Sequence, residues 1–280
     1  MIVSFHPIFK ADRNILCAGR DPDISDLAAI RAARAVILPQ GCAPRLYWMA
    51  RNNCPNIFPN YDTRFNYPGK IGQVKLFVEK SIAHPPTEIF HSLAEFKRRY
   101  PGQNTPSLPL VFKLDWGGEG DTVFMVRSTD ELDELVDHAA CCEASGHSGF
   151  LLQHYIPCGN RSLRVVIIGD RLSSYWRTGE DPAGFHASLS KGGKIDRAGD
   201  PVLKEAAEKV VGEFCRDTGI NLAGLDVIFD EAEPSPQPLL LEINYFFGRV
   251  GLGGSEAYYR TLKKAIRRWL KRIDLQQPSD

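Results

Sequence analysis

Residues 223–248 read AGLDVIFDEAEPSPQPLLLEINYFFG, and this stretch decides the fold. Two apolar runs of strand character, 223–229 and 239–244, flank a connection rich in Pro, Ser and Glu. Such a pattern predicts an antiparallel hairpin.

The polar residues of this hairpin form a pattern of their own. If the loop is centred on Pro234 without a bulge, Asp226 lies opposite Glu242, and Asn244 shares their face by alternation. Two facing carboxylates repel each other, which indicates that a cation lies between them. Oxygen ligands in this number suit Mg²⁺, with substrate phosphates completing its coordination shell. A solvated edge hairpin fits the pattern as well. The other face would be apolar and core-facing, with Leu225, Val227, Phe229, Leu239, Leu241 and Ile243.

Composition excludes several classes of protein. The chain has 280 residues, of which 43% are hydrophobic and 24% charged, as in a soluble globular protein of one large or a few small domains. Lys plus Arg and Asp plus Glu both number 34, so no net field favours nucleic acid or an anionic membrane as a partner. No signal peptide or membrane span is evident, which predicts a cytoplasmic protein. Seven cysteines without a Cys-x-x-Cys pair argue against a disulfide framework.

Alternating strand and helix patterns divide the chain into 1–72, 73–154 and 155–280. The first part is a small α/β unit. The second holds a glycine-rich loop between two strands, followed by a helix that starts at the capping box Ser128-Thr129-Asp130-Glu131. The third holds two hairpins and two helices, the first of them running from Pro201 to Gly219 with Asp200 as its cap, and the second basic and amphipathic.

The glycine-rich loop lies in KLDWGGEGDTVF, where Lys113 ends one strand and Gly117, Gly118 and Gly120 precede the next. Glycines let backbone N–H groups approach phosphate oxygens, and a lysine on the strand supplies charge for them. A hairpin loop that uses glycine only for its positive φ angles gives the same pattern.

A second hairpin turns at Gly169-Asp170, so residue 164 pairs with 175 and residue 162 with 177. Arg164 and Arg177 then project from one face, where two guanidiniums match phosphate or carboxylate oxygens. A solvated cationic face is the alternative. The arginine hairpin, the acidic hairpin and the glycine-rich loop are together the parts needed to hold a metal–nucleotide and an anionic second substrate.

In order over about residues 70 to 255, these motifs resemble the ATP-grasp enzymes, in particular the RimK-like carboxylate–amine ligases. The resemblance implies an α/β (α+β) fold: an N-terminal pre-ATP-grasp α/β domain, a small lid subdomain, and a C-terminal catalytic subdomain with an antiparallel sheet. The family's metal-binding acid and Glu-x-Asn fit Asp226, Glu242 and Asn244. Its arginines that hold phosphate and the acyl group fall on Arg164 and Arg177.

The resemblance also implies nucleotide and substrate residues. The two nucleotide lysines correspond to Lys75 and Lys113, beside the loop glycines 117, 118 and 120. The segment that clasps adenine corresponds to Gln153, His154, Tyr155 and Ile156. The segment FHASLSKGG and the residues after Asn244 place the substrate near His186, Ser188, Lys191, Tyr245 and Gly248.

Three departures from the family pattern stand out. His154 replaces a glutamate at a position that contributes mainly main-chain contacts. The ribose-binding acid is absent, with Gly159-Asn160-Arg161-Ser162 in its place. Tyr245-Phe246-Phe247-Gly248 stands where the family often has Ser-Pro-Gly, which indicates a different acceptor pocket lined by aromatic residues.

The activity implied is an ATP- and Mg²⁺-dependent ligase, with Mn²⁺ as an alternative metal. It would join a small-molecule or peptide carboxylate to an amine or thiol through an acylphosphate, releasing ADP and phosphate. A kinase on the same fold and a non-catalytic nucleotide-binding protein are the alternatives. Amphipathic surfaces are compatible with a homodimer.

Overall fold

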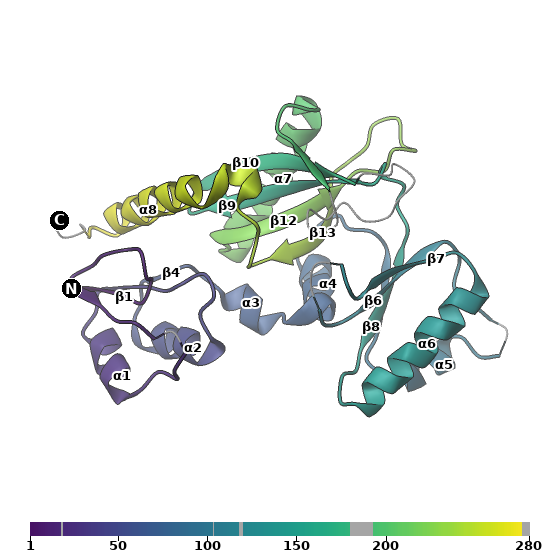
Figure 1. Cartoon of the computed structure of the whole chain (residues 1–280), viewed down its shortest axis with the longest axis horizontal. Helices are drawn as coiled ribbons and strands as arrows, with labels where there is room; N and C mark the ends of the chain where they lie inside the picture. The colour runs from purple at the N-terminus through teal and green to yellow at the C-terminus, as the bar shows by residue number, and fades with distance from the viewer. Residues whose placement is uncertain (18, 103, 118–119, 180–192, 276–280) are drawn as a thin grey trace.

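The computed structural model describes residues 1–17, 19–102, 104–117, 120–179 and 193–275. Three sheets follow one another along the chain, and Figure 1 shows the first at the N-terminus, the second with α5 and α6 at the far end, and the third beside α8. The mixed α/β architecture predicted from the sequence is therefore confirmed. None of the described helices is long and apolar enough to cross a membrane.

The N-terminal sheet is parallel, with the strand order β2-β1-β3-β4. Its elements are β1 (Ile2–Ser4), β2 (Arg13–Asn14), α1 (Ile24–Arg31), β3 (Ala35–Ile37), α2 (Pro44–Asn53) and β4 (Ile57–Phe58). Asp23 starts α1 with a capping box, because its carboxylate accepts from the N–H group of Asp26 and the Asp26 carboxylate accepts from the N–H group of Asp23. β1 and β3 are buried throughout, as parallel strands usually are, whereas the edge strand β2 is exposed.

The second sheet is antiparallel in the order β5-β8-β6-β7. Its elements are β5 (Thr87–Phe90), α5 (Leu93–Arg99), β6 (Leu110–Leu114), β7 (Val123–Val126), α6 (Thr129–Ala144) and β8 (Phe150–His154). One face packs on α5 and α6 around Phe90, Phe112 and Phe150. By alternation, Lys113 of β6 and Gln153 of β8 belong to the opposite face.

The third sheet is antiparallel in the order β11-β10-β9-β12-β13. Its elements are β9 (Arg161–Ile168), β10 (Arg171–Thr178), β11 (Lys194–Asp196), α7 (Pro201–Thr218), β12 (Leu222–Ile228), β13 (Leu239–Asn244), the 3₁₀ turn η2 (Val250–Leu252) and α8 (Gly254–Arg272). One hydrophobic core joins this sheet to the N-terminal one, with β1, β3, β9, β12 and α8 all contributing. These two units therefore fold onto each other.

Two helices connect the N-terminal sheet to the second sheet: α3 (Asp62–Asn66) and α4 (Gly69–Glu79). The boundary predicted at residue 72 falls inside α4, whereas the one predicted at 154 coincides with the end of β8. Gln73 of α4 fastens the outer edge of the third sheet, because its amide donates to Ile243 O (3.0 Å) and accepts from Ile243 N (2.7 Å).

Two local predictions are wrong. The acidic hairpin contains an irregularity between Asp226 and Val227, so Val227 pairs with Leu240. Leu240 therefore enters the core, and Leu239 and Leu241 stay partly exposed. Asp200 does stand at the N-cap of α7, but its side chain caps no helix N–H group. Its carboxylate accepts from Arg161 Nη1 instead.

Candidate nucleotide and metal site

The polar residues of both predicted hairpins meet on the third sheet. Asp226 of β12 pairs with Glu242 of β13 on one side and with Arg164 of β9 on the other. Arg164 pairs with Tyr175, and Ser162 pairs with Arg177, as the two-residue turn predicted. The predicted registers at 226/242 and 164/175 are confirmed, and they bring two carboxylates and two guanidiniums onto four neighbouring strands, β10, β9, β12 and β13.

Asp226 is held by arginines. Its Oδ1 accepts from Arg164 Nε at 2.5 Å and lies 2.7 Å from Arg177 Nη2, and its Oδ2 accepts from Arg164 Nη2 at 3.0 Å. Asn244 Nδ2 also donates to Oδ2, at 3.1 Å. Burial raises the pKa of Asp226, but the two guanidiniums together lower it by more than burial raises it. The pKa of Asp226 therefore lies below its ordinary value. The repulsion expected between the two carboxylates is thus relieved by protein cations.

Glu242 lies in a different electrostatic environment. Burial and the charge of Asp226 raise its pKa, while Lys113 and Lys70 act in the opposite direction. Lys113 is itself buried, and burial lowers its pKa to about 8 despite the nearby charges of Glu242 and Asp226. The charged form of a buried lysine is stabilised if an additional anion comes close to its ammonium group.

The glycine-rich loop joins β6 and β7, and Gly117 and Gly120 both have a φ of +83°. Gly118 lies outside the described residues. The base of the loop is tied to α4, because Lys70 Nζ donates to Trp116 O (2.7 Å) and Thr122 Oγ1 (3.2 Å). The loop therefore opens beside the first turn of α4.

Lys70, rather than the predicted Lys75, lies at the base of the glycine-rich loop. Lys75 is exposed, and its Nζ lies 3.2 Å from His91 Nε2. Lys70 is close enough to Glu242 and Lys113 for its charge to affect the pKa of both. Lys70 was not among the residues predicted from the sequence, although it stands just after Pro68-Gly69 at the start of a helix, a place where anions often bind.

The predicted adenine segment, 153–156, includes the last two residues of β8 and the two residues that follow it. Gln153 is buried and donates to Thr87 Oγ1 at 2.9 Å, whereas the side chain of His154 is exposed. Tyr155 lines a cavity of about 380 Å³. The other lining residues are Leu108, Pro109, Met125 and Arg127. Met125 pairs with Val111, as Gln153 does, so this cavity adjoins the face of the second sheet that carries Lys113.

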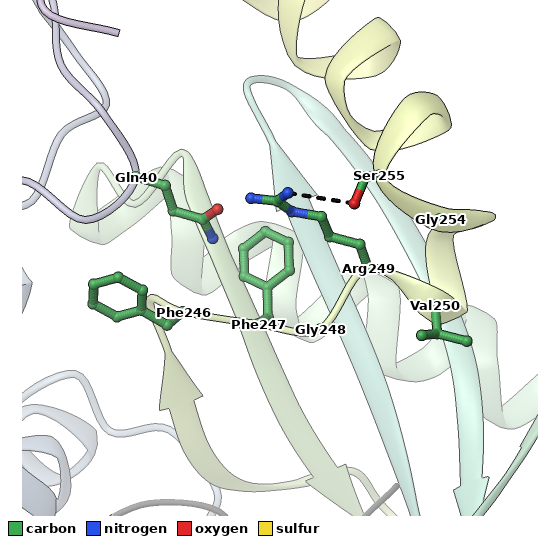
Figure 2. A pocket seen from close by; sticks show the side chains of 8 residues that line it. All are labelled: Gln40, Phe246, Phe247, Gly248, Arg249, Val250, Gly254 and Ser255. Carbon is green, nitrogen blue, oxygen red and sulfur yellow. Dashed lines mark hydrogen bonds between the residues drawn. The ribbon is translucent and has the colours of Figure 1, made fainter. Parts of the chain in front are cut away.

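The predicted substrate residues are separated. Tyr245 is buried, its hydroxyl lies 2.8 Å from Thr63 Oγ1, and burial raises its pKa, so it acts as part of the core. Gly248 lines a second cavity, shown in Figure 2. His186, Ser188 and Lys191 lie outside the described residues.

This architecture is the ATP-grasp fold. A RimK domain ATP-grasp protein from Sphaerobacter thermophilus superposes with a TM-score of 0.56 at 15% identity, covering 94% of this chain and 96% of that one. D-alanine–D-alanine ligase from Bacillus anthracis superposes with a TM-score of 0.58 at 14% identity, covering 93% of this chain and 86% of that one.

The chain belongs to the RimK-like ATP-grasp family, whose family model, described as RimK-like ATP-grasp domain, matches residues 69–267. A protein of Hahella chejuensis named probable alpha-L-glutamate ligase 2 is 24% identical over 184 residues, or 65% of this chain and 56% of that protein. A probable alpha-L-glutamate ligase of Sodalis glossinidius is 29% identical over 151 residues, or 53% of this chain and 46% of that protein. The chain thus spans about half the length of the curated relatives it matches.

Proposed function

We propose that this protein is an ATP- and metal-dependent ligase that joins a carboxylate to an amine or thiol through an acylphosphate, releasing ADP and phosphate. The observation that carries the proposal is the contact of Asp226 with both Arg164 and Arg177, directly opposite Glu242. Anion-binding cations and metal-binding carboxylates therefore share one surface. The names of the related ligases support an amino acid or peptide as the substrate.

The donors present fit a divalent cation. Among the described residues, no group of three or more His, Cys, Asp or Glu side chains is arranged so that it could hold a metal ion, so the amide of Asn244 and the phosphates would have to contribute. Asp226, Glu242 and the Asn244 amide oxygen suit Mg²⁺, or Mn²⁺ in its place, if phosphates complete the shell. A bound metal would neutralise charge on the phosphoryl group being transferred. To hold it, Asp226 must give up contacts with the arginines, and the Asn244 amide must turn its oxygen inward.

The lysines and the glycine-rich loop would hold the nucleotide. Lys113 is buried and its pKa is lowered despite the nearby carboxylates, so a phosphate would add to the negative charge of Glu242 and Asp226 around its ammonium group. Lys70 reaches the base of the same loop. Positive φ at Gly117 and Gly120 lets backbone N–H groups turn toward phosphate oxygens. Backbone groups of 153–156 would bind the base beside the cavity at Tyr155.

Arg164 and Arg177 would bind the substrate carboxylate once they release Asp226. Arg177 Nε is buried and has no hydrogen-bond partner among the described residues, although its Nη2 donates to Ser162 Oγ at 2.9 Å. A buried unpaired donor costs free energy, and an incoming carboxylate or phosphoryl oxygen would satisfy it. These guanidiniums stabilise negative charge as the carboxylate oxygen attacks phosphorus. An amine or thiol then displaces phosphate from the acyl carbon.

A screen for ADP release tests this function. Carboxylates and amines, starting with amino acids, are added singly and in pairs to the protein with Mg-ATP. We expect ADP release that depends on both partners, and a product in which the two are joined. A phosphorylated hydroxyl compound, formed without an amine, would contradict the ligase and favour a kinase.

A further inference from the structure

A cavity next to the C-terminal end of β13 is formed by the N-terminal unit and by the segment that follows β13. It has a volume of about 390 Å³, within the range of small-ligand sites, and cavities between domains often hold ligands. It lies between the N-terminal unit and the segment after β13, where Figure 2 shows Arg249 reaching back toward Gln40. The lining residues are Gln40, Phe246, Phe247, Gly248, Arg249, Val250, Gly254 and Ser255.

One end of this cavity is cationic. The Arg249 guanidinium lies 4.7 and 4.5 Å from the ring centres of Tyr258 and Tyr259, and its Nη1 donates to Ser255 Oγ at 3.4 Å. Within the described part of the chain, Arg249 forms no ion pair with a carboxylate. The aromatic rings therefore fix the guanidinium without neutralising its charge.

The start of α8 adds to the same positive end. This helix of 19 residues begins at Gly254, and its N-cap residue, Gly253, has no side chain to accept from the first-turn N–H groups. The partial positive charge of a helix N-terminus favours an anion. The described lining includes no carboxylate. An arginine fork beside a helix start suits a carboxylate as ligand.

The remaining wall is apolar. Phe246 and Val250, both part of the lining, are 61% and 66% exposed. The Phe246 ring is nonetheless fixed, with the Arg64 guanidinium 4.9 Å from its centre and Gly41 beneath it. Any side chain at residue 41 would meet this ring, since an added Cβ would lie 2.8 Å from Phe246 Cε1. This wall suits an apolar group on the ligand.

The cavity adjoins the arginines of the proposed reaction site. Gly224 lies between Phe247 and Arg164, since a Cβ added there would lie 3.1 Å from Phe247 Cβ and 2.9 Å from Arg164 Cδ. A ligand in the cavity is therefore separated from Arg164 by one aromatic side chain. A carboxylate at Arg249 would stand apart from Asp226 and Arg164, so it would not be the carboxylate that is activated.

We propose that this cavity binds the acceptor substrate, an amino acid with an apolar side chain, and that Arg249 selects it by its free carboxylate. The inference rests on the proposed function and names the substrate class of that site. Phe246, Phe247 and Val250 contact the apolar side chain, and the amino group is directed past Phe247 toward the acylphosphate. The amine attacks the acyl carbon, an amide bond forms, and phosphate leaves with the electrons of the C–O bond as the amine loses a proton.

Calorimetric titration in the presence of Mg-ADP tests the binding. Leucine, leucinamide and glutamate serve as probes, because leucinamide lacks the carboxylate charge and glutamate lacks the apolar side chain. We expect leucine to bind at least about tenfold more tightly than either. Arg249→Gln should weaken leucine about 10- to 100-fold and leucinamide far less. The matched control is Arg260→Gln, on an exposed arginine of α8 that pairs with Glu256, and it should bind like the unmodified protein.

Equal binding of leucine and leucinamide, no binding of any probe, or unchanged leucine binding in Arg249→Gln would overturn the proposal. So would glutamate binding more tightly than leucine. Leucine labelled with ¹⁸O in its carboxylate separates the two substrate roles, because an acceptor keeps its label and a donor transfers it to phosphate. Label in phosphate would overturn the acceptor assignment. If no carboxylate and amine pair releases ADP while leucine still binds through Arg249, the proposed ligase and the acceptor role fail, whereas the selection of an apolar amino acid by Arg249 stands.

Discussion

Arg164 and Asp226 form a buried bidentate ion pair, with Nε–Oδ1 and Nη2–Oδ2 distances of 2.5 and 3.0 Å. Arg177 adds a third contact, 2.7 Å from Oδ1. The carboxylate proposed to bind metal is thus neutralised by the cations proposed to bind substrate. If Asp226 binds metal and the arginines bind an anion, the two events are coupled, because a metal at Asp226 frees the arginines and an anion at the arginines frees Asp226.

This ion pair predicts that the two carboxylates differ in their effect on stability. Asp226→Asn removes the charge that two guanidiniums share and should lower the free energy of unfolding by about 3 kcal/mol. Glu242→Gln removes a charge that Asp226 repels and should change it by less than about 1 kcal/mol. Urea unfolding without ligands measures both. Equal losses in the two variants would argue against the arginine contacts with Asp226.

Lys113 predicts a dependence of stability on pH. Burial lowers its pKa in the folded protein from 10.5 to about 8. Below about pH 8 the folded state carries a buried charge, and between about 8 and 10.5 it has lost a proton that the unfolded state keeps. Stability should therefore rise with pH across this window relative to Lys113→Met, by a total on the order of 3 kcal/mol. Lys75→Met, at an exposed lysine, is the control. A constant difference between the unmodified protein and Lys113→Met would contradict the burial of the charge.

The choice between Lys70 and Lys75 is decided by nucleotide binding. Mg-ADP at a hundred times its Kd should stabilise the protein by about 2.7 kcal/mol, which raises the thermal midpoint. Lys113→Met and Lys70→Met should lose most of this shift, because both remove charge at the glycine-rich loop, and Lys75→Met should keep it. Loss of the shift in Lys75→Met alone would restore the assignment made from sequence.

Gly224 predicts a steric effect at the reaction site. A methyl group there would lie 2.9 Å from Arg164 Cδ and 3.1 Å from Phe247 Cβ, closer than carbon atoms normally approach. Gly224→Ala should cost about 1 to 3 kcal/mol of stability and reduce turnover by displacing Arg164. Gly102→Ala is a comparison at a glycine with no atom nearby, where only the backbone strain of a positive φ is expected. Full activity in Gly224→Ala would show that the position of Arg164 tolerates displacement.

Local patterns predicted the two hairpins well. The turn at Gly169-Asp170 sets the register of β9 and β10, and the symmetric spacing about Pro234 places Asp226 opposite Glu242. The bulge was not predictable, because 239–241 is a run of three leucines and any of them could enter the core. Lys70 and Lys75 lie on one helix, and only its packing shows which of them reaches the loop.

The ion pair at Asp226 could not be read from sequence. β9 and β12 are neighbours in the sheet although β10, β11 and α7 separate them along the chain. Pairing of such distant strands depends on the tertiary fold, so the contact of Arg164 with Asp226 has no local signal. The cavity at Arg249 likewise depends on Gln40, which comes from the N-terminal unit.

Isotope transfer tests the central claim most directly. A carboxylate that supports ADP release is labelled with ¹⁸O and incubated with the protein, Mg-ATP and the acceptor, and the released phosphate is analysed by mass spectrometry. If an acylphosphate forms, the attacking carboxylate oxygen becomes the bridge to phosphorus and leaves with it, so each turnover yields phosphate with one carboxylate oxygen. Unlabelled phosphate formed alongside a joined product would contradict the acylphosphate route.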